Sequence, residues 1–383
     1  MKKYYASILA LLFFSISGYS QTIYETINSR ILNAERELKV QLPRNYTKNS
    51  EKNYPIILVM DGDYLFEPVA GNVDYFSYWE EMPEAIVVGI NHNGKREDDT
   101  TYGYNNFLPA DQGADFFEFI ATELMPFLSE NYRTVKFSII VGHDITANFI
   151  NYYLLKENPI FNGYINLSPD YANQMADRIH NRLSSINKKI WFYQATGTND
   201  IKSIQEGVIS LDNRLKEINR NNIFYSSDNF ADQSHYSLVG NAIPKAFEDF
   251  FSFFRPISKK EYDEVILPLE TSAYDYLVEK YDVIENLFGL GKTIRVNDFL
   301  AIAAALEKKK NWEELEKLGK LARKEYPNTM LGNYYLARAY EESGEPKKAM
   351  KTYQNAFILE EVAFLTKDLM LEKTEKIKAD FGY

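Results

Sequence analysis

The sequence contains no cysteine among its 383 residues. Disulfide bonds, thiolate catalysis, cysteine zinc sites and a lipid-modified N-terminal cysteine are therefore excluded. The chain also lacks an excess of basic residues, since 43 Lys and Arg face 54 Asp and Glu, which gives a net charge of −11. Nucleic acids and anionic membrane surfaces select for basic patches, so we expect neither as a partner.

No apolar run in the sequence is long enough to cross a bilayer, so no transmembrane segment is expected. The main apolar run, residues 8–16, follows two lysines and precedes small residues at the positions expected for a cleavage site. This pattern predicts a secretory signal peptide over residues 1–20, cut before Gln21. The mature protein is therefore expected to be exported, either to the periplasm or to the outside.

The composition is 45% hydrophobic and 15% aromatic, which is enough for two packed cores. Over residues 21–257, short apolar runs alternate with segments of helical periodicity. The predicted strands are 23–31, 38–42, 55–60, 85–90, 137–141, 163–167, 189–195 and 223–227, and the predicted helices are 111–131, 171–183, 201–218 and 239–254. The first two strands look like an antiparallel pair. The rest predict a parallel α/β sheet with helices on both faces and a site at the carboxyl ends of the strands.

From residue 258 onward the sequence contains only amphipathic helical patterns. Similarity recurs at a period of 34 residues, so that Ala303 and Leu306 precede Ala337 and Tyr340. The second copy resembles a tetratricopeptide repeat, most clearly at Leu336, Ala337, Tyr340, Gly344, Ala349, Tyr353 and Ala356. We expect helices 272–287 and 362–381 to cap this second domain, 258–383. The resemblance implies a protein or peptide partner.

Residues 137–150 read as a strand, a tight turn at Gly142 and a helix. This is the context of the GxSxG nucleophile elbow, in which a serine sits on a strained turn above a parallel sheet. Asp144 stands in the place of the serine, and Thr146 stands in the place of the second glycine. Asp144, Asp200 and His235 also follow the chain order of nucleophile, acid and base, with Asp200 after strand 189–195 and His235 after the last strand.

The polar stretch 91–106 is a long predicted loop, of the kind that carries function more often than packing. It contains His92, Arg96, Asp98 and Asp99. His92 could contact a ligand, but a single loop histidine is more often solvated, and we expect solvation here.

Residues 27–254 resemble the putative esterase family that includes esterase D and the enterochelin-type esterases. The match is carried by residues 59–63, 88–90, 113–117, 142–143, 161–162, 168–169 and 234–235. The resemblance implies an α/β-hydrolase fold and serine hydrolysis of carboxylic esters. No metal and no cofactor are expected, and the Asp61-Gly62-Asp63 turn is interpreted as an oxyanion turn rather than a metal loop.

Carried over residue by residue, His235 matches the base and Asp200 matches the acid, with Glu206 as a substitute. The resemblance implies an oxyanion hole of backbone N–H groups at Gly62 and Asp63, after the Met60 strand, and at Ile145, directly after the nucleophile. His143 is expected to shape the pocket.

The match fails at Asp144, and at Thr146 a β-branched side chain is expected to crowd the elbow and reshape it. The first hypothesis is a pseudo-esterase in which Asp144 and His235 form an ion pair, because a carboxylate is a poor acyl acceptor. Such a protein would serve in binding or as a scaffold through its repeats and could still take a small ester-like ligand.

The second hypothesis is an active hydrolase. Asp144 would be the nucleophile, as in haloalkane dehalogenases and epoxide hydrolases, with His235 activating water against the ester intermediate. Those enzymes enclose their substrate under a helical cap, for which residues 163–188 leave no room. Another group, such as Ser168 or Ser234, could also replace the missing serine, and the sequence singles out neither.

Overall fold

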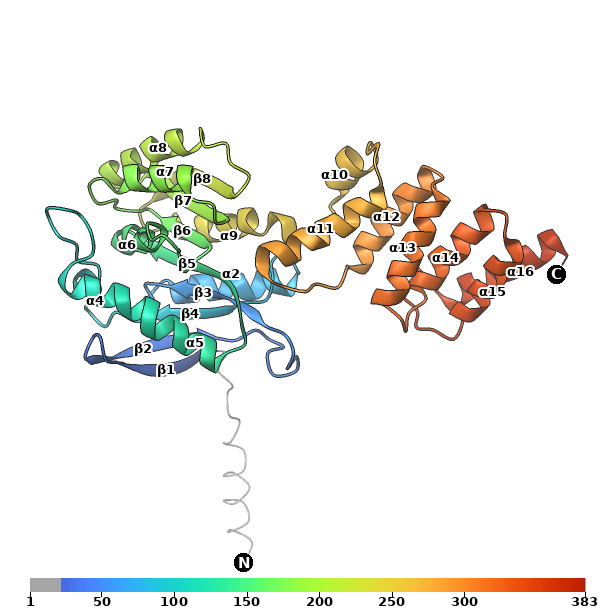
Figure 1. Cartoon of the computed structure of the whole chain (residues 1–383), viewed down its shortest axis with the longest axis horizontal. Helices are drawn as coiled ribbons and strands as arrows, with labels where there is room; N and C mark the ends of the chain where they lie inside the picture. The colour runs from blue at the N-terminus through green and yellow to red at the C-terminus, as the bar shows by residue number, and fades with distance from the viewer. Residues whose placement is uncertain (1–21, 383) are drawn as a thin grey trace, which may run out of the picture. The chain divides into compact units, whose positions relative to one another are not determined.

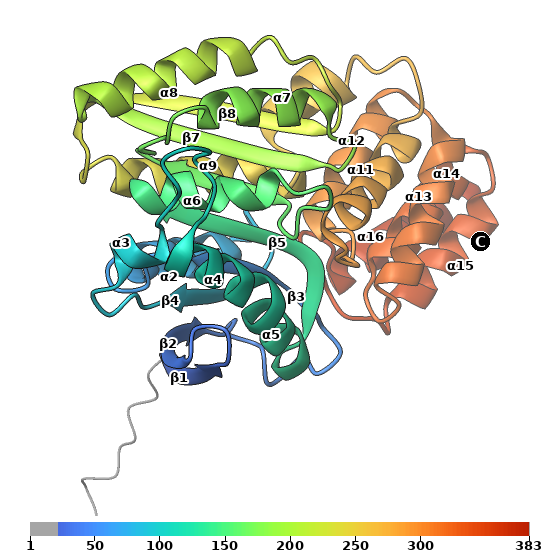
Figure 2. The same ribbon diagram turned by 60° about the vertical axis from the view of Figure 1, so that its left-hand side comes forward.

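The structure, a computed structural model, describes residues 22–382 (Figures 1 and 2). The predicted signal peptide, 1–20, lies outside the described residues. The described chain divides into two compact units. The first holds the residues up to Tyr75, Glu84–Thr134 and Ser138–Ala246, and the second holds Phe76–Pro83, Val135–Phe137 and the residues from Phe247 onward. The second unit thus includes three segments from the predicted first domain, residues 76–83, 135–137 and 247–257, and the predicted boundary at residue 257 stays a prediction.

The first unit is built on one eight-stranded sheet in the order β1-β2-β4-β3-β5-β6-β7-β8. The strands are β1 (Thr22–Ser29), β2 (Ala34–Gln41), β3 (Tyr54–Val59), β4 (Ile86–Ile90), β5 (Thr134–His143), β6 (Gly163–Leu167), β7 (Ile190–Asn199) and β8 (Ile223–Ser234). β1 and β2 form the predicted antiparallel pair, β2 runs antiparallel to β4, and all other neighbours are parallel. This confirms the expected α/β fold with a mostly parallel sheet.

The central strands are apolar because helices cover both of their faces. Every residue of β3 and β4 is buried, as the unbroken apolar runs predicted. The helices are α2 (Phe66–Tyr78), α3 (Arg96–Asp99), α4 (Asp111–Phe119), α5 (Met125–Asn131), α6 (Ile145–Leu154), α7 (Met175–Ser185), α8 (Lys202–Leu215) and α9 (Val239–Phe250). One core packs between the sheet and α4, α6, α7 and α8, while α2 lies on the opposite side of the strands (Figure 2).

Several elements differ from the prediction. The helix α2 was not among the predicted helices. The loop 91–106 contains a one-turn helix, α3. The helix predicted from residue 171 begins at Met175, because Asn148 Oδ1 accepts the N–H of Ala172 and holds the preceding residues in a loop. β8 continues to Ser234, far beyond the predicted residue 227. As the last strand of the sheet order it is half-exposed and its far half is polar, so hydrophobic alternation does not reveal its length.

The second unit is helical, as expected. Its longer helices are α11 (Ala273–Phe288), α12 (Val296–Lys308), α13 (Trp312–Glu325), α14 (Leu331–Glu342), α15 (Pro346–Ala356) and α16 (Lys367–Phe381), with a short α10 (Lys259–Glu261) before them. Each of α12 to α16 packs on the helix before it in the chain. A Cβ atom on Gly332 would lie 2.4 Å from the backbone N of Arg323, so a glycine is needed where α14 crosses α13. Within residues 22–382, no helix combines the length and the apolar character that crossing a membrane requires.

Candidate active site

The predicted elbow is present at the carboxyl end of β5. Asp144 joins β5 to α6 with φ 61° and ψ −123°, a conformation that costs free energy for any residue with a side chain. A Cβ atom on Gly142 would lie 2.7 Å from the backbone N of Ala147 and the carbonyl carbon of Thr146. Gly142 therefore permits the close approach of strand and helix, and the aspartate occupies an intact elbow.

Thr146 does not crowd this elbow, so that expectation was wrong. Its side chain is buried, and its hydroxyl accepts the N–H of His143 at 2.9 Å and donates to the carboxylate of Asp61. The tight approach falls on Gly142 instead. Thr146 thus donates a hydrogen bond to the buried carboxylate of Asp61. A glycine at this position could not do so, because it has no side-chain donor.

Arg96, on α3, links that buried carboxylate to the elbow. Its Nε donates to Asp61 Oδ1 at 2.6 Å, and one terminal nitrogen, NH1, donates to Asp144 Oδ2 at 3.1 Å. The other, NH2, donates to the carbonyl of His143 at 2.7 Å and to the hydroxyl of Tyr64 at 3.2 Å. Burial lowers the pKa of Arg96, but the charge and hydrogen bond of Asp61 outweigh it, and the net pKa is raised. Arg96 stays charged and neutralises part of the elbow's negative charge.

His235 and Asp200, the predicted base and acid, are hydrogen-bonded to one another. His235 Nδ1 lies 2.9 Å from Asp200 Oδ1, and the other oxygen of Asp200 accepts from Ser168 and Thr196. Burial raises the pKa of Asp200, but the hydrogen bonds from Ser168, Thr196 and His235 outweigh burial and lower it overall. An ionised Asp200 can only accept, so the proton of a neutral His235 resides on Nδ1.

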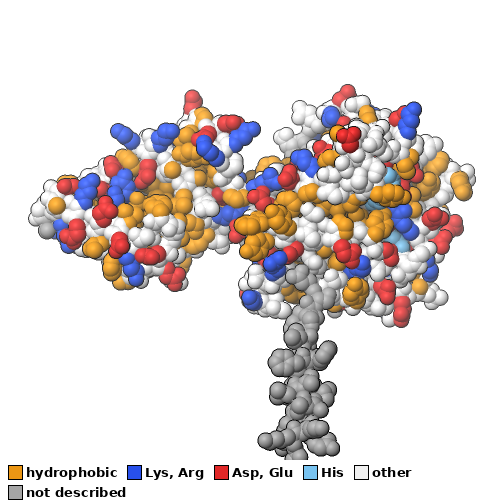
Figure 3. Space-filling model, turned by 180° about the vertical axis from the view of Figure 1, so that it is seen from behind, with side chains coloured by type: hydrophobic (Ala, Val, Ile, Leu, Met, Phe, Trp, Pro, Cys, Tyr) orange, Lys and Arg blue, Asp and Glu red, His pale blue; other side chains and the backbone are white. Residues whose placement is uncertain are grey.

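The third predicted member, Asp144, lies near His235 without bonding to it. His235 Nε2 is 4.0 Å from Asp144 Oδ1, which is too long for a hydrogen bond. The structure thus brings Asp144, Asp200 and His235 together at the carboxyl edge of the sheet. On the face seen in Figure 3, histidine side chains reach the surface beside cationic and hydrophobic ones.

The other proposed acid and nucleophiles lie elsewhere. Glu206 is on α8, 66% exposed and paired with Lys202. Ser168 is buried on the Nδ1 side of His235, where it bonds to both His235 and Asp200. Ser234 bonds to Ser237. None of the three faces Nε2, the nitrogen that would activate a nucleophile.

The predicted oxyanion residues have different positions. The N–H of Gly62 donates to the carbonyl of Ile90 at 2.8 Å, so it is committed to the neighbouring strand. A carboxylate oxygen of Asp63 accepts the N–H of His92 at 2.8 Å and fastens the start of the loop. Ile145 is the first residue of α6, directly after the elbow.

His143 lies between the triad and Tyr64. Its Nδ1 is 3.0 Å from the Tyr64 hydroxyl, and its Nε2 is 3.0 Å from the carbonyl oxygen of His235. Burial lowers the pKa of His143. A neutral His143 therefore holds the backbone at His235, and its role in shaping the pocket stays a prediction.

His92 is buried, not solvated as expected. Its Nδ1 lies 2.8 Å from Asp99 Oδ2, and the other oxygen of Asp99 accepts from Arg36 at 2.6 Å and from Gln112 at 2.9 Å. Buried charges require such partners. This cluster anchors α3, the helix that presents Arg96. The sequence could not predict the anchoring role of His92 or the bridging role of Arg96, because the loop that carries them has no periodicity. The only signal in the sequence was a long, charged loop after a central strand.

A family model described as "Putative esterase" matches residues 29–204. The match includes Asp144 and Asp200 and ends before His235. Among curated proteins, none matches the chain at a significant level.

Several solved structures resemble the chain. An uncharacterised protein from Capnocytophaga ochracea is 30% identical with a TM-score of 0.84, over 94% of this chain and 100% of that one. An IroE-like serine hydrolase from Shewanella oneidensis is 18% identical with a TM-score of 0.60, over 79% and 99%. The siderophore hydrolase EstB from Aspergillus nidulans is 14% identical with a TM-score of 0.51, over 62% and 96%. At 18% and 14% identity, the similarity to these last two structures shows a shared fold alone.

The buried His143 predicts a pH dependence of stability. The pKa of His143 in the folded chain lies below the ordinary 6.5. As the pH falls through 6.5, His143 therefore binds a proton in the unfolded chain but not yet in the folded chain. The wild type should lose stability relative to His143→Gln by up to about 1.4 kcal/mol per pH unit until the folded-state pKa is reached, whereas above pH 7.5 the difference should be constant. Urea unfolding at pH 8 and pH 5.5 measures this. His180→Gln, on α7, is the control, and parallel curves for wild type and His143→Gln would contradict the prediction.

Proposed function

The chain belongs to the putative esterase family of α/β-hydrolases, and on that premise we propose that its esterase site is catalytically degenerate and serves for binding. The observation that carries this proposal is the ion pair between Asp144 and Arg96 at the elbow. In this reading the helical region engages a protein or peptide partner.

The chemistry of the elbow supports a loss of ester hydrolysis. A serine hydroxyl attacks a carbonyl as its proton passes to the histidine, whereas an aspartate carboxylate has no hydroxyl proton to give. Its negative charge would also oppose the oxyanion that develops beside it. Arg96 holds one carboxylate oxygen at 3.1 Å, which reduces the nucleophilicity of the group further.

A second candidate function is hydrolysis through Asp144 as nucleophile. It is favoured by the strained elbow, which projects Asp144 as it would a serine, and by the intact pair of His235 and Asp200. His235 would then activate water against an aspartyl ester. The pairing of Asp144 with Arg96 speaks against it, because this contact stabilises the ground state of the carboxylate.

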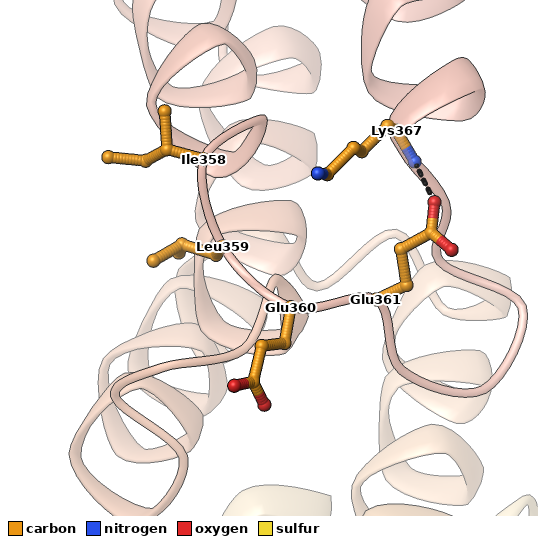
Figure 4. Close-up of a pocket in the computed structure, with 5 residues that line it drawn as sticks. All are labelled: Ile358, Leu359, Glu360, Glu361 and Lys367. Atoms are coloured by element: carbon orange, nitrogen blue, oxygen red, sulfur yellow. Dashed lines mark hydrogen bonds between the residues drawn. The ribbon is translucent and has the colours of Figure 1, made fainter.

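The helices α12 to α15 support a repeat-like partner surface. α13 and α15, at Trp312 and Pro346, begin 34 residues apart, the period of tetratricopeptide repeats. An open pocket of about 450 Å³ lies on the loop between α15 and α16 (Figure 4). It is lined by Ile358, Leu359, Glu360, Glu361 and Lys367. Ile358 is 86% exposed, which favours a partner with an apolar group.

Localisation and domain limits belong to the same proposal. Residues 1–20 would direct export to the periplasm or the outside and then be removed. The mature chain would consist of an esterase-like domain, 21–257, and a helical domain, 258–383. Export would bring the repeats into contact with envelope proteins.

Hydrolysis of p-nitrophenyl acetate by the purified chain tests the proposed function. Wild type should show no more turnover than His235→Ala. Asp144→Ser restores the hydroxyl on an intact elbow, so its turnover should exceed that of wild type by about a hundredfold or more and should vanish when His235→Ala is added. Asp144→Asn is the matched control for removal of the charge alone. Wild-type turnover that both Asp144→Asn and His235→Ala abolish would favour the second function instead.

Capture from an envelope extract tests the partner surface. The full chain should retain a protein that Ile358→Glu does not retain, because a buried charge at the contact is costly. Tyr104→Glu, at a 92% exposed position of the first unit, is the control and should capture as wild type does. Equal capture by wild type and Ile358→Glu would argue against this surface.

A further inference from the structure

Two hydrogen-bond acceptors face one another at the elbow. The hydrogen bonds of Asp200 place the proton of a neutral His235 on Nδ1, which leaves Nε2 as an acceptor. Nε2 points toward Asp144 Oδ1, which is also an acceptor, at 4.0 Å. A single donor atom about 2.8 Å from each would fit between them. The pair is therefore shaped to receive a group that carries at least two N–H or O–H bonds.

The nitrogen of His235 lacks a partner within the described part of the chain. The residue is only 7% exposed, and Nε2 makes no hydrogen bond to any residue in 22–382. Nε2 is not among the fully buried atoms, so water or a ligand can complete its hydrogen bonding.

The charges around the gap favour a cation. Asp61 and Asp200 are fully satisfied by the contacts described above, and Arg96 occupies only Oδ2 of Asp144. Asp170 also lies close to Asp144, because its backbone N–H donates to the carbonyl of Asp144 at 3.2 Å. Burial, and then the charge of Asp144, raise the pKa of Asp170, while His235 acts in the opposite direction. One guanidinium thus stands among four carboxylates.

Aromatic rings border the same gap. Tyr236 packs edge to face on His235, with ring centroids 4.9 Å apart, and is 78% exposed. Tyr64 contacts Arg96 and His143 through its hydroxyl and is 46% exposed. Tyrosine rings attract cations through their faces and offer apolar area to a substituent.

We propose that this site binds a protonated primary amine, whose ammonium group donates to Asp144 Oδ1 and to His235 Nε2. The inference rests on the proposed function, since it requires Asp144 to act as an anion that binds rather than as a nucleophile. An ester carbonyl has no proton to offer to either acceptor, and a carboxylate ligand would be repelled. The substitution of serine by aspartate thus changes the ligand class from a neutral ester to a cationic amine.

A charge series on one scaffold tests the proposal. Benzylammonium, benzyl alcohol and benzoate differ in charge and donor number but share the ring. Isothermal titration of the full chain at pH 7 should give measurable binding for benzylammonium, at least about tenfold weaker binding for the alcohol, and none for benzoate. Equal affinity for the alcohol, or tighter binding of benzoate, would overturn the proposal.

Variants locate the binding. Asp144→Asn and His235→Gln should each weaken benzylammonium binding by about tenfold or more, because each removes one charged or buried acceptor. Asp177→Asn removes the exposed partner of Arg214 and should leave the affinity unchanged. Thermal unfolding of each variant confirms that it folds; since the two site variants change different elements, folding of either one suffices. Full affinity in a folded Asp144→Asn or His235→Gln variant would refute the site.

The two proposals fail separately. Turnover of p-nitrophenyl acetate that depends on Asp144 would contradict the degenerate site, whatever binds there. Absence of benzylammonium binding in an inactive wild type would contradict the amine ligand and leave the proposed loss of catalysis intact.

Discussion

The guanidinium of Arg96 holds the elbow together electrostatically. It bridges Asp61, which is fully buried, and Asp144, which takes the position of a nucleophile, at 2.6 and 3.1 Å. A buried carboxylate without a cation or donors would cost several kcal/mol, and a second carboxylate nearby would add repulsion. The positive charge directly beside the strained turn therefore stabilises the aspartate that the turn carries.

The helix that carries Arg96 is itself anchored at its other end. Arg36, on β2, and His92 both bond to Asp99, one helical turn beyond Arg96, and all three side chains are buried. Arg96 and Asp99 thus fasten the two ends of one short helix, Asp99 to the edge region of the sheet and Arg96 to the elbow. The electrostatic environment of Asp144 therefore depends on contacts at β2, through α3, as well as on its immediate neighbours. The fold of the family positions both sets of contacts.

The sequence predicted the parts of the fold that depend on periodicity and motif. Unbroken apolar runs identified β3 and β4, and the strand-turn-helix pattern around Gly142 identified the elbow. The chain order of Asp144, Asp200 and His235 placed all three at one edge of the sheet. The rest depends on contacts distant in sequence. The role of Arg96 and the burial of His92 are set by partners on other elements, and the hydroxyl of Thr146 serves Asp61, which lies 85 residues earlier. β8 is long because it pairs with β7, although the residues of its far half are polar.

A double-mutant cycle on the elbow ion pair tests the central claim most directly. Urea unfolding would be measured for wild type, Arg96→Met, Asp144→Asn and the double variant. If Arg96 holds the elbow carboxylate, each single change removes the same contact, and the cycle should give a favourable coupling of about 1 to 3 kcal/mol. Strictly additive effects would show that the two groups do not depend on one another, and the account of a carboxylate retained at the elbow by its arginine would be wrong.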